Sequence, residues 1–291
     1  MTVTIPTKVL VLGATGMLGN AMLRVFAASP GHTAMGSARS GAGVRGLPEG
    51  LRASVHTGVD VENIDTLAAL LARVRPQVVI NCVGLVKQLA EAEDPLAALP
   101  VNAMLPHRLS RLCGLVGARL VHVSTDCVFA GTRGLYTEAD APDAQDLYGR
   151  SKLLGEVTGD KHAITLRTSI IGHELSTRHS LVAWFLGQTG PVQGFAKAVF
   201  SGLPTVELAV VVRDHVLPHP ELSGLFHVSA EPIDKLALLR LLAAQYGRDT
   251  VITPDNRLVI DRSLDSQRFR QATGYAPPAW PELVRRMHAF G

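Results

Sequence analysis

The chain has 291 residues, 47% of them hydrophobic, and a formal net charge of only +3 at pH 7. This composition can bury a large core and excludes a disordered chain, and the scattered Lys and Arg residues form no basic tract that would bind nucleic acid. The three cysteines are far apart in apolar segments, and no Cys-x-x-Cys or His-Glu-x-x-His spacing occurs, so we expect neither disulfides nor a metal site.

The start of the chain, MTVTIPTKVLVLG, has neither the basic residues nor the cleavage site of a signal peptide. No segment contains the roughly 18 consecutive apolar residues that a membrane-spanning helix needs. We therefore expect a soluble, cytoplasmic protein without a membrane partner.

Short β-branched runs alternate with helical patterns in the first half of the chain. Strands are predicted in KVLVLG, HTAMGSA, PQVVINCVG and ARLVHVSTD, and helices over residues 17–28, 62–75 and 95–116. The Gly-rich segment SGAGVRGLPEG is predicted to be a surface loop. Strands that take turns with helices form parallel sheets covered on both faces, so we predict a doubly wound α/β fold of the Rossmann type.

The alternation continues in the second half. HAITLRTSIIG and GLFHVS are predicted to contain strands, and SLVAWFLGQ and residues 233–246 to form helices. The tail PPAWPELVRRMHAF is predicted to be a last amphipathic helix.

The first predicted strand runs directly into GATGMLG, which places Gly13, Gly16 and Gly19 between a strand and a helix. Glycines at such a turn let the backbone approach a pyrophosphate, which then lies against the positive end of the helix. The G-x-x-G-x-x-G spacing differs by one residue from the G-x-G-x-x-G fingerprint. We predict a dinucleotide site formed by the whole turn, which also contains Thr15, Met17 and Leu18.

The second strand of a dinucleotide-binding fold usually ends in an acid that binds the ribose of NAD. Here the sequence is GSARS, and a guanidinium at Arg39 suits the 2′-phosphate of NADP. NADP is therefore predicted over NAD, although a merely exposed Arg39 also fits the pattern. Asp60 and Val61 follow in TGVDVEN, and Asp60 is predicted either to accept a hydrogen bond from the adenine amine or to cap the next helix.

Polar residues follow a buried strand in VHVSTDCVF, at the carboxyl edge where open α/β sheets bind ligands. A hydroxyl of Ser124 or Thr125 can hydrogen bond a substrate carbonyl there, and the same residues also suit a turn or a cap. In DLYGRSKLLGE, Tyr148 and Lys152 are four residues apart, so the phenol and the ammonium share one face of a helix. The pair suits proton transfer, and it also suits an amphipathic helix with a half-buried Tyr and a solvated Lys.

Taken together, GATGMLG, NCVG, VSTDCVFAG, YGRSKLLGE and LRTSIIG resemble the extended short-chain dehydrogenase/reductase superfamily and, within it, the dTDP-4-dehydrorhamnose reductase family. The resemblance covers most of the chain. It implies a reductase that transfers a hydride from NADPH to a ketone. Tyr148 would be the proton donor, Lys152 the residue that lowers the pKa of Tyr148 and anchors the ribose, and Thr125 the hydroxyl that holds the substrate oxygen.

The resemblance implies further cofactor contacts outside the glycine turn. They lie in NCVG, at Cys82, Val83 and Gly84, and at Asn102 in PVNAML. Asn81 and Asn102 match family positions near the cofactor, and as isolated residues they also suit turns or caps.

The substrate implied by the resemblance is a nucleotide-linked 4-keto-6-deoxy sugar. A smaller α/β substrate domain is expected from residues 170–204 and 229–291, beside an NAD(P)-binding domain of residues 1–169 and 205–228. A homodimer is expected because family members often pair. Surface charge also explains some of the candidate substrate contacts, which are Lys87, Gln88, Ser124, Cys127, His179 and Arg262.

Two alternatives stay open. Cys127 stands where the family usually has an aromatic residue, and Cys127 with His179 loosely resembles the Cys and His of GDP-fucose synthase, which epimerises before it reduces. A thiol and an imidazole, with ordinary pKa values of about 8.5 and about 6.5, can move protons beside a ketone. The other alternative is a cofactor-binding protein without reductase activity, such as the regulatory subunit of methionine adenosyltransferase, although the presence of Thr125, Tyr148 and Lys152 favours catalysis.

Overall fold

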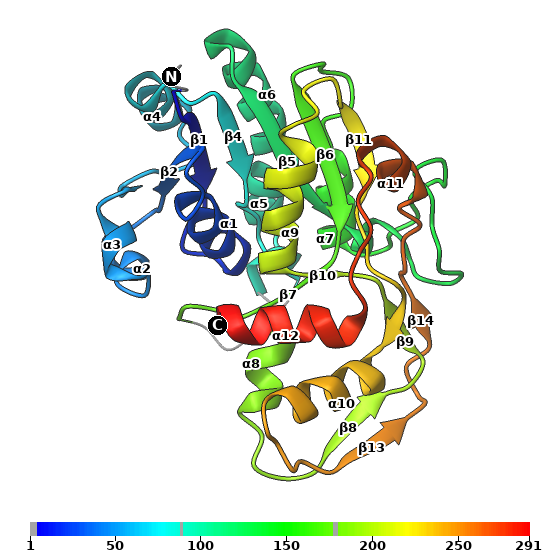
Figure 1. Ribbon diagram of the computed structural model, residues 1–291. Coiled ribbons are helices and arrows are strands. Elements are labelled where there is room, and N and C mark those ends of the chain that lie inside the picture. The colour runs from blue at the N-terminus through cyan, green and yellow to red at the C-terminus, as the bar shows by residue number, and fades with distance from the viewer. Residues whose placement is uncertain (1–4, 88–89, 177–179) are drawn as a thin grey trace.

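The computed structural model describes residues 5–87, 90–176 and 180–291 of the chain. Within these residues a seven-stranded parallel sheet has the order β11-β6-β5-β4-β1-β2-β3 (Figure 1). The predicted α/β fold of the Rossmann type is therefore confirmed. The strands are β1 (Thr7–Leu12), β2 (His32–Ser37), β3 (Val55–His56), β4 (Val78–Asn81), β5 (Arg119–Thr125), β6 (Ala163–Thr168) and β11 (Gly224–His227).

Helices cover both faces of the sheet, because successive side chains of a strand point to opposite sides. In β1, Val9 and Val11 belong to one apolar cluster, and Leu10 and Leu12 belong to another. Two helices, α1 (Met17–Ala27) and α9 (Thr205–Val211), pack together on one face, and α4 (Ile64–Val74) and α6 (Leu105–Val116) cover the other (Figure 1). The sheet is thus buried on both sides.

The order of the strands reverses beside β1. The chain runs outward through β2 and β3, and then adds β4, β5, β6 and β11 on the other side of β1. The carboxyl ends of β1 and β4 flank this reversal, which is where open α/β sheets bind ligands. Other helical elements of the sheet region include η1 (Ala90–Glu93), η3 (Asp126–Val128), α7 (Leu147–Leu154) and η4 (Val212–Val216).

Residues 180–200 and 233–261, called the smaller lobe below, lie beyond the carboxyl edge of the sheet (Figure 1). Here β12 and β14 flank β9, and β13 pairs with β8. The connection between the lobe and the sheet contains a short pair of parallel strands, β7 (Ile170–Ile171) and β10 (Leu203–Pro204). Two C-terminal helices follow the lobe in the chain: α11 (Gln267–Thr273) lies against β11, and α12 (Trp280–Phe290) contacts α9 and α10. The lobe consists of α8 (Leu181–Leu186), β8 (Val192–Phe195), β9 (Ala198–Phe200), β12 (Ile233–Asp234), α10 (Lys235–Gln245), β13 (Ile252–Asp255) and β14 (Ile260–Asp261).

The Gly-rich segment predicted to be a surface loop contains two helical turns, α2 (Gly41–Val44) and α3 (Glu49–Arg52), so that prediction is wrong for these residues. Val44 and Leu47 are buried, which fixes the segment on the sheet region. The Arg52 guanidinium donates hydrogen bonds of 2.9 Å to the carbonyl oxygens of Leu47 and Arg45, and these bonds hold the turns together.

The helix predicted over residues 95–116 begins as α5 (Pro95–Ala98), widens into the π-helical segment η2 (Leu99–Met104) and continues as α6. The carboxylate of Asp94 caps the start by accepting a 2.9 Å hydrogen bond from the Leu96 N–H. Pro100 and Pro106 lack the N–H that an α-helix interior uses, which explains why the helical ladder changes its spacing here.

Candidate active site

At two positions of the turn after β1, Gly13 and Gly19, the backbone conformation and close packing require glycine. Gly13 has a φ of 75°, which other residues rarely adopt. A Cβ on Gly19 would lie only 2.0 Å from the Gly13 carbonyl oxygen, so α1 could not start this close to β1 with a side chain there. A Cβ on Gly13 would lie 3.0 Å from Val83 Cγ2, which places the segment after β4 directly beside the turn.

Gly16 is different, because a side chain at this position would not clash with other atoms of the protein. A Cβ there would meet the Gly13 carbonyl oxygen at 3.4 Å, an ordinary contact, and Gly16 is exposed. Gly16 is also the N-cap of α1, whose first turn has no side-chain cap and no acidic residue. The free N–H groups and the open approach fit a pyrophosphate. Thr15 and Met17 are half-buried beside this opening, whereas Leu18 packs into the core.

The predicted nucleotide contacts after β2 and β3 lie on the surface. Arg39 is exposed, and its guanidinium makes no hydrogen bond or ion pair within the described part of the chain. Asp60 is exposed, and its Oδ1 accepts a 3.0 Å hydrogen bond from the Glu62 N–H. The cap of α4 is Asn63, which accepts a 2.9 Å hydrogen bond from the Asp65 N–H, so the N-cap alternative for Asp60 is wrong. Val61 packs against the core on the α4 side of the sheet.

Asn81 and Asn102 hold the segment after β4 in place. The Asn102 Oδ1 accepts a hydrogen bond from the Leu85 N–H at 2.9 Å, while its Nδ2 donates to the Leu85 carbonyl at 3.4 Å and to Ser151 Oγ at 3.2 Å. The Asn81 Oδ1 accepts from the Val83 N–H at 3.1 Å. Both Asn side chains are buried and act by positioning the backbone.

The segment after β4, residues 82–84, lies between the turn after β1 and α7. Burial raises the pKa of the Cys82 thiol to about 12, so Cys82 stays a neutral thiol. Gly84 is exposed, and a Cβ on it would lie 3.3 Å from Asn102 Oδ1 and 3.9 Å from Lys152 Nζ. The segment after β4 therefore lies between the predicted pyrophosphate site and Lys152.

Packing of α7 on the end of β5 brings the predicted catalytic residues together. The Asp146 carboxylate caps α7 by accepting a 2.7 Å hydrogen bond from the Gly149 N–H. A Cβ on Gly149 would lie 2.3 Å from the Cys127 carbonyl oxygen, so only glycine allows this close approach. As a result, Tyr148 lies close enough to Thr125 for this side chain to affect the pKa of the phenol.

The Thr125 hydroxyl has two hydrogen-bond partners in the residues next to it. It accepts a 3.1 Å hydrogen bond from the Cys127 N–H and donates a 3.2 Å hydrogen bond to Asp126 Oδ1. Burial raises the pKa of Asp126, while the charges of Arg262 and Lys235 act in the opposite direction. Thr125 is thus oriented by its immediate neighbours.

The protonation states of Tyr148 and Lys152 follow from burial. Burial and the neighbouring Cys127 raise the pKa of Tyr148, and the Thr125 side chain opposes this shift, so Tyr148 is a phenol at neutral pH. Burial lowers the pKa of Lys152 to about 8, and the charge of Glu156 opposes that shift. Lys152 Nζ donates a 2.9 Å hydrogen bond to the carbonyl of Val123 in β5, two residues before Thr125.

Ser124, which is predicted to contact substrate, also has a partner inside the protein. Its hydroxyl donates a 2.7 Å hydrogen bond to Glu156 Oε1, and Glu156 also receives two 2.7 Å hydrogen bonds from Arg167 on β6. Ser124, Glu156 and Arg167 are all buried. Sequence reasoning did not single out Glu156 as a site residue, and its position four residues after Lys152 was the available signal.

The other predicted substrate contacts lie around the same edge. Lys87 forms a 2.7 Å ion pair with Asp146, and Arg262 Nε donates a 2.8 Å hydrogen bond to the Phe129 carbonyl. Burial and the charge of Asp126 raise the pKa of the Cys127 thiol to about 12, so this thiol stays protonated at neutral pH. Gln88 and His179 lie outside the described residues.

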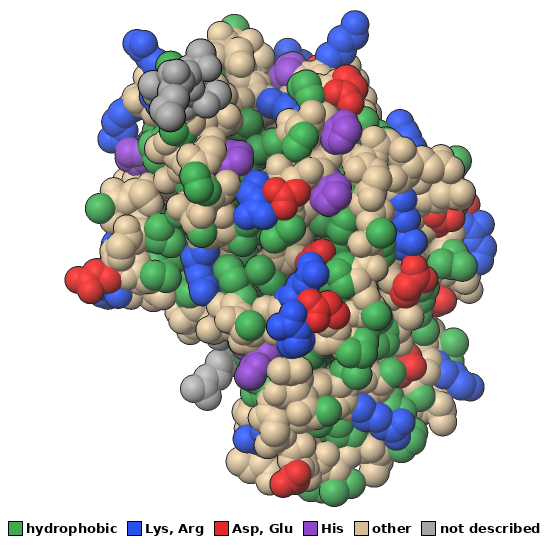
Figure 2. Space-filling view, viewed as in Figure 1, with side chains coloured by type: hydrophobic (Ala, Val, Ile, Leu, Met, Phe, Trp, Pro, Cys, Tyr) green, Lys and Arg blue, Asp and Glu red, His purple; other side chains and the backbone are tan. Residues whose placement is uncertain are grey.

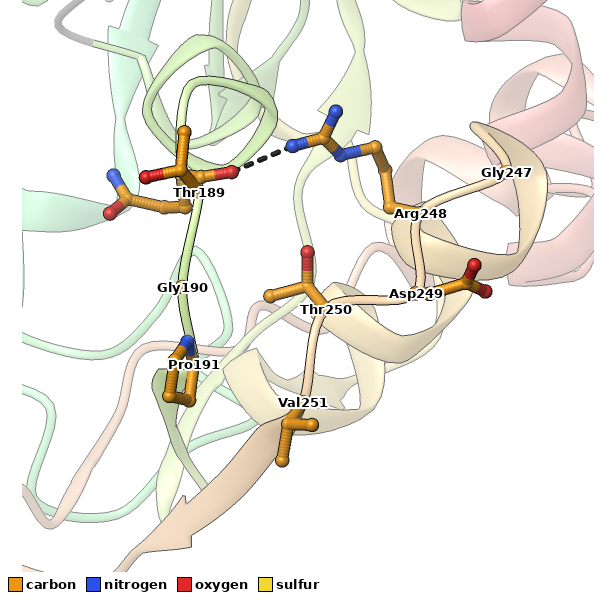
Figure 3. Close-up of a pocket in the computed structure, with 9 residues that line it drawn as sticks. Thr189, Gly190, Pro191, Gly247, Arg248, Asp249, Thr250 and Val251 are labelled. Carbon is orange, nitrogen blue, oxygen red and sulfur yellow. Dashed lines mark hydrogen bonds between the residues drawn. The ribbon is translucent and has the colours of Figure 1, made fainter.

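Two further surface features are the charge pattern of one face and a hollow in the smaller lobe. Lys and Arg side chains are interspersed with Asp and Glu on the face shown in Figure 2. A hollow of about 350 Å³ lies between the turn after α8 and the loop before β13, where Arg248 donates a 2.6 Å hydrogen bond to the Gln188 carbonyl (Figure 3). Its lining contains none of the predicted site residues.

The described residues contain no helix with the length and apolar character needed to cross a membrane. In the same part of the chain, no group of three or more His, Cys, Asp or Glu side chains could hold a metal ion.

A doubly wound sheet, a glycine turn at its reversal point and a Thr-Tyr-Lys group at the neighbouring strand end define an extended short-chain dehydrogenase/reductase. The model of the RmlD substrate binding domain matches residues 7–233. The chain belongs to this family, as the sequence motifs predicted.

Solved structures and known proteins that resemble this chain include nucleotide-sugar enzymes of the same fold. A dTDP-4-dehydrorhamnose reductase from Bacillus anthracis, solved in complex with NADP, has a TM-score of 0.78 at 21% identity and covers 99% of this chain and 100% of its own, which shows a shared fold. A probable low-salt glycan biosynthesis reductase of Haloferax volcanii is 29% identical over 225 residues, which are 77% of this chain and 70% of that protein. Methionine adenosyltransferase 2 subunit beta of mouse is 32% identical over 155 residues, 53% of this chain, and the match spans only 43% of that relative.

Proposed function

We propose that the protein is an NADPH-dependent reductase that converts the ketone of a nucleotide-linked 4-keto-6-deoxy sugar into an alcohol. The observation that carries this proposal is the grouping of Thr125, at the carboxyl end of β5, with Tyr148 and the buried Lys152 of α7, whose Nζ donates a 2.9 Å hydrogen bond to the Val123 carbonyl of the same strand. The Bacillus anthracis protein of the same fold, a dTDP-4-dehydrorhamnose reductase in complex with NADP, supports both the substrate class and the cofactor.

The cofactor would lie along the switch point of the sheet. The N–H groups at the start of α1 would bind its pyrophosphate, and Arg39 would pair with the 2′-phosphate that distinguishes NADP from NAD. The exposed Asp60 carboxylate would accept a hydrogen bond from the adenine amine, and Lys152 would donate a hydrogen bond to the nicotinamide ribose. The bound cofactor supplies the hydride.

The chain's own residues would handle the oxygen of the ketone. The Thr125 hydroxyl would hold this oxygen, and Tyr148 would donate the proton that it receives as the alcohol forms. The raised pKa of Tyr148 keeps the proton on the phenol until the substrate oxygen becomes basic. The charged Lys152 would then favour the phenolate that remains.

The smaller lobe faces the edge that carries Thr125, which supports a role for it in holding the sugar. We keep the division into a cofactor domain of residues 1–169 and 205–228 and a substrate domain of residues 170–204 and 229–291 as part of this proposal. Limited proteolysis with and without nucleotide sugar tests it, since substrate should protect cleavage sites in the second set of residues.

The direct test is oxidation of NADPH by the purified protein with a panel of nucleotide-linked keto sugars in heavy water, with the products read by mass spectrometry. We expect turnover without deuterium on carbon. Carbon-bound deuterium above spontaneous exchange would instead indicate the epimerising reductase, for which the Cys127 thiol is a proton donor and not a base at neutral pH.

The similarity to methionine adenosyltransferase 2 subunit beta favours one further candidate, a cofactor-binding protein without reductase activity. Tyr148→Phe separates the two functions. In a reductase this variant should lose 10²-fold to 10⁴-fold in turnover, roughly the contribution of a general acid, while it still binds NADPH. A Phe variant as active as the natural protein would exclude Tyr148 as the proton donor.

A further inference from the structure

A lysine of the smaller lobe extends toward the catalytic edge of the sheet. Lys235 is the first residue of α10, directly after β12, which pairs with β9. Asp234 fixes the start of this helix by accepting a 2.8 Å hydrogen bond from the Ala237 N–H. The Lys235 ammonium lies 3.7 Å from the centre of the Phe200 ring in β9, so its stem is held by the lobe and its position is well defined.

The charge of Lys235 acts on the residues that flank Thr125. Burial lowers the pKa of Lys235, and interactions with Asp126 and Cys127 oppose that shift. These two residues directly follow Thr125 in the chain, and Asp126 accepts the hydrogen bond from the Thr125 hydroxyl. The geometry agrees, because Arg262 joins β9 to the segment after Thr125: its N–H donates a 3.1 Å hydrogen bond to the Val199 carbonyl, and its Nε donates to the Phe129 carbonyl. Lys235, which lies over the ring of the next residue of β9, is therefore on the part of the lobe that adjoins this segment.

Lys235 is half-buried, and it lacks the hydrogen-bond and ion-pair partners that an ammonium in such a place normally has. Within residues 5–87, 90–176 and 180–291, no oxygen accepts a hydrogen bond from its Nζ, and no carboxylate lies within ion-pair distance. An ammonium has three donors, and partial removal from water without acceptors costs free energy. A ligand that supplies an acceptor at this point would recover that cost.

The neighbouring carboxylate decides which ligand suits the position. Asp126 would repel a diphosphate placed between it and Lys235, whereas a hydroxyl group is uncharged and accepts a hydrogen bond from an ammonium. If Thr125 holds the ketone oxygen, one of the two ring carbons next to the ketone carries a hydroxyl, while the other carries the methyl group of the 6-deoxy sugar. We infer that Lys235 is a substrate-binding residue that donates a hydrogen bond to a sugar hydroxyl close to the ketone.

This inference rests on the proposed function, because it takes the sugar as the ligand. Lys235→Met tests it, since Met keeps an unbranched apolar chain against Phe200 and removes only the charge and the donors. Lys197→Met is the matched control, because Lys197 is an exposed lysine of the same lobe. Calorimetry would measure binding of the keto sugar nucleotide and of the free nucleoside diphosphate to each NADP⁺-loaded variant, with NADPH affinity and thermal unfolding measured alongside.

We expect Lys235→Met to weaken binding of the sugar nucleotide about tenfold to hundredfold, as expected for loss of a charged hydrogen bond. Affinity for NADPH and for the free nucleoside diphosphate should stay within about twofold of the natural protein, as should every affinity of Lys197→Met. A deoxy analogue that lacks the contacted hydroxyl should bind both proteins equally.

Three results would overturn the assignment. Equal binding of the sugar nucleotide by Lys235→Met and the natural protein would remove Lys235 from the site. Equal losses for the sugar nucleotide and the free diphosphate would show that Lys235 binds phosphate. Equal discrimination against every deoxy analogue before and after substitution would exclude a hydroxyl partner. Failure of the natural protein to bind any keto sugar nucleotide would instead overturn the proposed function itself.

Discussion

Glu156 and Arg167 form a 2.7 Å ion pair inside the protein, with side chains that are each only 4% exposed. Arg167 lies on β6, and Glu156 follows α7, the helix that carries Tyr148 and Lys152. The pair thus holds the end of α7 against the sheet, and Ser124 adds a link to β5. The geometry of the site depends on a carboxylate that need not contact the substrate.

Loss of this carboxylate should destabilise the protein strongly. Glu156→Ala leaves the buried guanidinium of Arg167 without its partner, and we expect the free energy of unfolding to fall by about 3–5 kcal/mol. Urea denaturation measures the change. The control is Arg285→Ala, which breaks an exposed ion pair with Glu282 and should leave the unfolding midpoint nearly unchanged. Similar effects of the two substitutions would contradict a structural role for the buried pair.

The activity should fall as the pH rises through the pKa of Lys152. This pKa is lowered to about 8, so the ammonium is present below pH 8 and is lost above it. The logarithm of kcat/KM for reduction, plotted against pH, should decline on the alkaline side with a midpoint near this value. Because the charge of Glu156 raises the pKa of Lys152, Glu156→Gln should move the midpoint to lower pH.

The same profile separates an electrostatic role of Glu156 from a purely structural one. Ser124→Ala removes the hydrogen bond to Glu156 but leaves the carboxylate in place, so it should lower stability slightly and keep the midpoint. If Glu156→Gln lowers the rate equally at every pH, its charge does not act on Lys152.

Two neighbouring glycines should respond differently to alanine. Gly19→Ala places a Cβ 2.0 Å from the Gly13 carbonyl oxygen and should cost about 1–3 kcal/mol of stability, as overpacked sites do. Gly16→Ala meets only an ordinary 3.4 Å contact, so it should cost less stability than Gly19→Ala, a few tenths of a kcal/mol to about 1 kcal/mol for alanine at the N-cap of α1. The methyl group would nevertheless narrow the approach to the start of α1, and NADPH affinity should fall. Thermal unfolding and a fluorescence titration with NADPH measure both effects, and unchanged affinity in Gly16→Ala would remove this turn from the cofactor site.

Local patterns in the sequence were sufficient to predict the alternating strands and helices and the juxtaposition of Thr125, Tyr148 and Lys152. These features depend on short-range periodicity and on the rule that parallel strands end at one edge. The pairing of Tyr148 with Lys152 follows from helical spacing alone. Packing of α7 on the segment after β5 then makes the contact with Thr125.

Contacts between distant parts of the chain could not be predicted in this way. Asn102 holds Leu85 and Ser151, which are 17 and 49 positions away, and a single Asn gives no sign of such partners. Ser124 had the expected position at the sheet edge, but its neighbour Glu156 supplies an acceptor inside the protein. In each case side-chain packing in three dimensions selects the partner.

Arg39 should decide the preference for NADPH over NADH. Its guanidinium is exposed and has no partner in the described residues, so a 2′-phosphate would not have to displace an existing interaction. Arg39→Ser should therefore raise the KM for NADPH about tenfold to hundredfold, because it removes a charged hydrogen bond, and leave kinetics with NADH unchanged. Initial rates with both cofactors measure the ratio, and Arg45→Ser serves as the control because it changes a nearby Arg of the α2 to α3 segment. Equal loss with NADPH and NADH would mean that Arg39 supports the fold of this edge and does not read the phosphate.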